Sequence, residues 1–159
     1  MNNKDKIILG IDPGTNRIGY GVIRTVGRKT SYLASGLIEI KERYAPDQLV
    51  RIYDGISSLI EEYSPDIIAV EKLFFSNNKK TAMTVAEARG VILLAAAKKG
   101  TVITELAPNE VKQITTGHGQ ADKKAVLKMV GLILGLSDFK PIDDTSDALA
   151  IAIAGSIIS

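Results

Sequence analysis

The chain is 159 residues long, with 45% hydrophobic and 24% charged residues and a formal net charge of +2. This size and composition predict a single globular domain over residues 1–159. The chain contains no cysteine, which excludes disulfides, thiolate metal sites and a cysteine nucleophile. The apolar run before Asp12 is far too short for a signal peptide or a membrane span, so we expect a cytoplasmic protein with no membrane partner.

The first third of the sequence predicts three adjacent strands. Residues 7–11 are apolar, and the turn-forming Asp12-Pro13-Gly14-Thr15 ends that strand. Residues 18–24 and 31–40 are rich in β-forming side chains, and Gly27 lies in the polar connection between them. We therefore expect an antiparallel meander.

The remainder alternates between strands and helices. Apolar residues recur at helical spacing between Asp47 and Tyr63, and Ser64-Pro65 ends that helix. The later patterns predict strands at 66–71 and 101–106 and helices at 81–99, from 108, at 123–134 and from 143 to the terminus. The sequence thus predicts a mixed α/β sheet covered by helices.

Two of the predicted strands end in an acid. Asp12 follows Ile11 directly, and Glu71 follows Val70. The carboxyl ends of strands in an open α/β sheet face the crevice where ligands bind. One such acid is common at a strand boundary, but two in comparable positions favour a functional site.

A third group of acids lies at the start of the last helix. Asp147 can share a helix face with either Asp143 or Asp144, because residues three and four apart are neighbours. Asp143 suits a capping role, which does not explain all three acids. The helix is otherwise almost wholly apolar, so a charged Asp147 needs a partner or a bound cation.

If Asp12, Glu71, Asp147 and one of its neighbours converge, positive charge must offset their repulsion. Hard oxygen ligands without thiolates predict Mg²⁺, with Mn²⁺ as a substitute. Two such ions can drive displacement at a phosphodiester. The residues therefore predict a metal-dependent nuclease.

Several segments, in this order, resemble a known family, the RuvC Holliday-junction resolvases of the RNase H-like nuclease superfamily. They cover nearly the whole chain and comprise residues 8–15 (ILGIDPGT), 19–23 (GYGVI), 70–75 (VEKLFF), 117–124 (GHGQADKK) and 144–152 (DTSDALAIA). The resemblance implies an RNase H-like fold with a mixed sheet of about five strands and helices on both faces.

The resemblance also implies an activity and a site. The catalytic and metal-binding acids would be Asp12, Glu71, Asp144 and Asp147, with two ions per site, so the resemblance selects Asp144 over Asp143. The enzyme would be a homodimer that cuts opposed strands of a four-way DNA junction in recombination and DNA repair, with a branch-migration motor as a further partner. Twofold symmetry in the protein would match that of the junction.

Three further residues match family positions that contact DNA. Phe74 corresponds to an aromatic wedge that stacks on junction bases, although a core position is the alternative. Lys112 and Lys123 correspond to lysines that contact phosphate near the acids, although each alone could be an ordinary surface lysine. His118, between two glycines, is assigned no role.

Basic residues are clustered along the sequence, as at Lys123, Lys124 and Lys128, which permits a basic surface around an acidic centre. Each cluster alone is more typical of a solvated face. Three alternatives stay open: another RNase H-like nuclease that acts on RNA or other branched DNA, a non-catalytic junction-binding protein, and an actin-like ATPase that shares the Asp-Pro-Gly turn.

Overall fold

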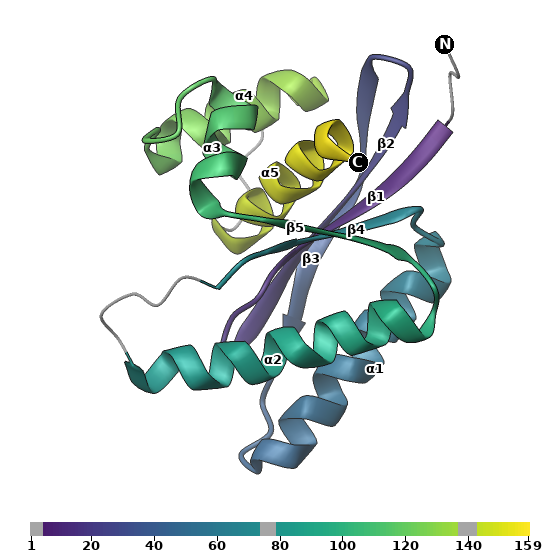
Figure 1. Cartoon of the computed structure of the whole chain (residues 1–159), viewed down its shortest axis with the longest axis vertical. Coiled ribbons are helices and arrows are strands. Elements are labelled where there is room, and N and C mark those ends of the chain that lie inside the picture. The colour runs from purple at the N-terminus through teal and green to yellow at the C-terminus, as the bar shows by residue number, and fades with distance from the viewer. Residues whose placement is uncertain (1–4, 74–78, 137–142) are drawn as a thin grey trace.

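The computed structural model describes residues 5–73, 79–136 and 143–159, with the backbone alone at residues 79, 80 and 143 (Figure 1). In chain order its elements are β1 (Asp5–Asp12), β2 (Arg17–Val26), β3 (Lys29–Glu39), α1 (Ala45–Tyr63), β4 (Ile67–Glu71), α2 (Lys79–Lys98), β5 (Val102–Leu106), α3 (Pro108–Thr116), α4 (Lys123–Leu134) and α5 (Asp143–Ile158). The predicted strands and helices are confirmed, with ends that differ by a few residues.

The described residues form a five-stranded sheet in the order β3-β2-β1-β4-β5. The first three strands pair antiparallel, as the meander prediction required, and Gly27 adopts a φ of 61° in the β2–β3 turn. Strands β4 and β5 extend the sheet in parallel to β1. This mixed sheet confirms the predicted fold class.

Helices cover both faces of the sheet (Figure 1). On one face, α1 and α2 pack on a buried cluster that includes Leu9, Ile11 and Val70. On the other, α5 lies directly on the sheet, and α3 and α4 pack against it around Ile8, Ile67 and Ala69. Side chains alternate along a strand, so each strand supplies both cores.

At Gly10 and Gly19, helix α5 approaches the sheet so closely that a side chain would not fit beneath it. A Cβ atom on Gly10 of β1 would lie 2.5 Å from the backbone nitrogen of Ala152 and closer still to the carbonyl oxygen of Ala148. A Cβ on Gly19 of β2 would lie 2.7 Å from the carbonyl carbon of Asp144. These glycines set the height of α5 above β1 and β2.

Among the residues that the structure describes, no helix is both long and apolar enough to cross a membrane.

We expect Gly10→Ala to lower the free energy of unfolding by about 2–3 kcal/mol, because the added methyl group would push α5 away from β1. Urea unfolding followed by circular dichroism measures the change. Gly90→Ala is the matched control, because Gly90 lies on α2 with open space around it, and its replacement should raise stability by up to about 1 kcal/mol. Equal stabilities for the two variants would contradict the packing role of Gly10.

Candidate active site

Asp12 and Glu71 lie side by side at the ends of two parallel strands. The register of β1 and β4 pairs Gly10 with Ala69 and Ile11 with Val70, so the next residue of each strand is the acid. Both acids share the sheet face of Gly10 and Ala69, because side chains alternate along a strand. That is the face covered by α5, and both carboxylates are partly buried there.

The first turn of α5 supplies Asp144 and Asp147. The close packing of Asp144 over Gly19 holds this turn beside the end of β1. Both side chains are partly buried, and the residues between them, Thr145 and Ser146, are buried. The four acids predicted from the sequence therefore lie around one end of the β1–α5 contact.

A cavity of about 180 Å³ brings three of these acids together with two lysines. Asp12, Glu71 and Asp147 line it with Lys112 of α3 and Lys123 of α4. Nζ of Lys123 lies 3.6 Å from Oδ2 of Asp147. The cavity thus holds an acidic centre with cationic walls.

A second cavity, of about 390 Å³, lies on the other side of Asp12. Its walls are the residues 12–17 and Asp144. Arg17, the first residue of β2, forms an ion pair with Asp144 here. The sequence reasoning missed Arg17. Its position five residues after Asp12 can be read from the sequence, but its partner, Asp144, is remote in sequence.

Two of the acids, Asp12 and Glu71, have a raised pKa. Burial raises the pKa of Asp12 to about 8, and the negative charges of Glu71, Asp147 and Asp144 contribute in that order. Burial and the charge of Asp147 also raise the pKa of Glu71, which Lys112 opposes. Loss of solvation and mutual repulsion both disfavour the charged forms. A cation among these groups would relieve both effects.

The donor atoms suit a hard divalent cation. Every acid offers carboxylate oxygens, the ligand type that Mg²⁺ and Mn²⁺ prefer. Within the described ranges, however, no group of three or more histidine or acidic side chains is already arranged to hold a metal ion. Asp144 instead faces Arg17, and Asp147 lies near Lys123. The residue types fit a metal site, and the carboxylates would have to turn to form it.

The remaining predicted residues have different positions. Phe74 lies outside the described residues, as does the side chain of Asp143, so their proposed roles stay predictions. His118 is exposed, and its Nδ1 accepts a hydrogen bond from the backbone N–H of Gln120 at 3.1 Å, which stabilises the loop. Neither cavity beside the acids is lined by His118.

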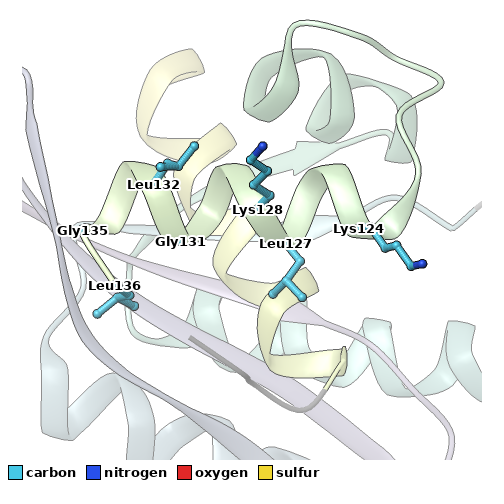
Figure 2. A pocket seen from close by; sticks show the side chains of 7 residues that line it. All are labelled: Lys124, Leu127, Lys128, Gly131, Leu132, Gly135 and Leu136. Carbon is cyan, nitrogen blue, oxygen red and sulfur yellow. The ribbon is translucent and has the colours of Figure 1, made fainter. Parts of the chain in front are cut away.

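A further hollow of about 580 Å³ runs along α4, away from the acids (Figure 2). Lys124 and Lys128 line it together with Leu127, Leu132 and Leu136. Figure 2 shows that all of these side chains come from α4 and the residues just after it. The lysines of this helix therefore divide between two surfaces, with Lys123 at the acids.

Comparison with known proteins gives consistent matches over almost the whole chain. The family model described as "Crossover junction endodeoxyribonuclease RuvC" matches residues 8–155. The proteins of that name from Rubrobacter xylanophilus and Natranaerobius thermophilus are each 46% identical, over 93% and 94% of this chain and 83% and 94% of their own lengths. The solved structure titled "T. thermophilus RuvC in complex with Holliday junction substrate" matches with a TM-score of 0.88 and 32% identity, over 95% of this chain and 93% of that one.

The raised pKa of Asp12 predicts a pH-dependent gain in stability for Asp12→Asn in the absence of metal. An unfolded aspartate has a pKa near 3.9, so the folded wild type binds more protons between about pH 4 and pH 8 and loses stability as the pH rises through that range. Asparagine removes this loss. We expect the variant to melt at the wild-type temperature near pH 4 and roughly 3–8 °C higher at pH 8.5.

Thermal unfolding in EDTA across this pH range measures the effect. Asp5→Asn is the control, because Arg24 lowers the pKa of the exposed Asp5 at the opposite end of β1, so its replacement should give no gain at high pH. A melting difference for Asp12→Asn that does not grow with pH would contradict the raised pKa of Asp12.

Proposed function

Because the chain belongs to the RuvC family of crossover junction endodeoxyribonucleases, we propose that Asp12, Glu71, Asp144 and Asp147 are its catalytic and metal-binding carboxylates. The chain is a nuclease that resolves Holliday junctions in DNA recombination and repair. The observation that carries the site assignment is the cavity in which three acids meet Lys112 and Lys123. It combines groups that bind a cation with groups that bind phosphate.

We infer that the cation is Mg²⁺, with Mn²⁺ able to substitute, and that two ions bind in each site. Divalent ions held by these oxygens would lower the pKa of a water molecule and stabilise the oxygen that leaves phosphorus. The support is the all-oxygen donor set, together with the burial and the neighbouring negative charges that raise the pKa of Asp12 to about 8. Buried residues of β1, β4 and α5 next to these acids fix the strand ends and the helix turn that carry them.

The two lysines act on the DNA. Lys123 is largely exposed and Lys112 is partly buried, so their ammonium groups can contact phosphate at the rim and inside the cavity, respectively. A cation near the reacting phosphate also stabilises negative charge that develops during cleavage. Phe74, three residues after Glu71 in the sequence, remains our candidate for stacking on junction bases.

We propose that the enzyme works as a homodimer in the cytoplasm and that a branch-migration motor delivers its substrate. One active site cuts one strand, so paired cuts in a four-way junction need two sites related by twofold symmetry. The match to a junction-bound relative over 95% of the chain supports this substrate over RNA or simple duplexes.

Asp147→Asn should abolish junction cleavage, by at least about a thousandfold, because it removes one of the charges that hold the metal ions. Binding to the junction should persist, since phosphate contacts supply most of the affinity. Cleavage of a synthetic four-way junction in Mg²⁺, beside a linear duplex and an RNA–DNA hybrid, measures the activity. Asp122→Ala is the control, because Asp122 caps α4 and lines neither cavity beside the acids. Equal wild-type cutting of all three substrates would overturn the assignment.

Dimeric action predicts a particular product pattern. With each arm end-labelled in turn, wild-type protein should produce two symmetric nicks in opposed strands. Mixed dimers of wild-type and Asp147→Asn protomers, purified by separate affinity tags, should produce one nick per binding event. Sedimentation should give twice the mass of one chain. A wild-type monomer that still makes paired nicks would refute the dimer.

A further inference from the structure

Arg17 is the third cation beside the acids, and it lies apart from the two lysines. It begins β2 on the far side of Asp12, and its guanidinium forms an ion pair with Asp144. Its side chain is 51% exposed, whereas that of Asp144 is 26% exposed. An arginine with half its surface in solvent can change partners at little cost, because exposed ion pairs are weak.

Three of the acids each have a basic residue nearby. Lys123 lies near Asp147, and Lys112 acts on Glu71, both within the smaller cavity. Arg17 and Asp144 face each other in the larger cavity instead, and Asp12 lines both. A DNA strand that crosses Asp12 would therefore meet lysines on one side and Arg17 on the other.

We propose that Arg17 forms a phosphate-binding subsite in the larger cavity and that Asp144 holds its guanidinium until a metal ion takes over that carboxylate. The inference rests on the proposed function of Asp144 as a metal ligand. In this exchange the metal replaces Arg17 at Asp144, and Arg17 turns to a backbone phosphate of the DNA strand.

The exchange follows from competition for one carboxylate. Asp144 faces Arg17, and among the described residues no three acids are grouped as metal ligands, so Asp144 would have to leave Arg17 in order to bind a metal ion. A guanidinium that loses its carboxylate retains its charge and its forked donors, which match a phosphate as well as they match a carboxylate. The cavity around Arg17 has a volume of about 390 Å³, which leaves room for a phosphate group.

The first test measures metal binding without DNA. Mn²⁺ is titrated into the protein and free Mn²⁺ is followed by electron paramagnetic resonance. Arg17→Gln removes the competitor and should bind Mn²⁺ about two- to fivefold more tightly than wild type. Arg17→Lys retains the charge and should lie closer to wild type.

Arg24→Gln is the matched control for this titration. It breaks an Arg–Asp ion pair on the same strand but at the opposite end of the sheet, where Arg24 pairs with Asp5. Screening by salt leaves little of its charge effect at the acids. It should bind Mn²⁺ as wild type does. Equal or weaker Mn²⁺ binding by Arg17→Gln would overturn the competition.

The second test asks whether Arg17 contacts a DNA phosphate once it has left Asp144. Junction affinity is measured against salt concentration in Ca²⁺, with denaturing gels to verify that the DNA stays intact, and again in EDTA. In Ca²⁺, Arg17→Gln should reduce the slope of log affinity against log salt by about 0.9 for each Arg17 that contacts a phosphate. In EDTA the slopes should agree, because Arg17 stays on Asp144. Equal slopes in Ca²⁺ would overturn the phosphate subsite.

Failure of the inference can be told from failure of the proposed function. Wild-type protein that binds Mn²⁺ and cuts the junction, beside an Arg17→Gln variant that matches it in both tests, overturns only the role of Arg17. Wild-type protein that binds no Mn²⁺ and leaves the junction uncut overturns the metal site, and the role of Arg17 is overturned with it.

Discussion

The structure depends on the close contact between α5 and the β1–β2 pair. At Gly10 and Gly19 the sheet has no side chain, so the backbone of α5 lies directly against it. This contact brings the first turn of α5 to the end of β1, so acids far apart in sequence become neighbours. A larger residue at Gly10 would meet Ala148 and Ala152 of α5, and one at Gly19 would meet Asp144 itself, so either would displace the helix turn that carries Asp144 and Asp147.

That contact has an electrostatic cost, because it concentrates four carboxylates in a partly buried place. The raised pKa of Asp12 is the measure of that cost. Cations from three separate elements offset it: Arg17 of β2, Lys112 of α3 and Lys123 of α4. The fold therefore presents an acidic centre whose repulsion is balanced from several directions, which suits a site that must receive both metal ions and DNA.

Local patterns predicted most of the fold and three of the acids. Asp12 and Glu71 could be placed because each ends an apolar strand, and Asp147 because a buried helix follows it. The strand order and the approach of α5 could not be predicted from local patterns, since Gly10 reads only as a glycine within a strand. Arg17 was missed because its partner, Asp144, is brought to it by tertiary packing. The assignment of Asp144, and the role of Phe74, came from family resemblance and not from local physical reasoning.

The two cavities that flank Asp12 differ in their cationic residues, with lysines on one side and an arginine on the other. A nucleic acid strand has direction, and a site with unlike sides can accept it in one direction only. The unequal walls around one aspartate would therefore favour one 5′-to-3′ direction of the bound strand over the other.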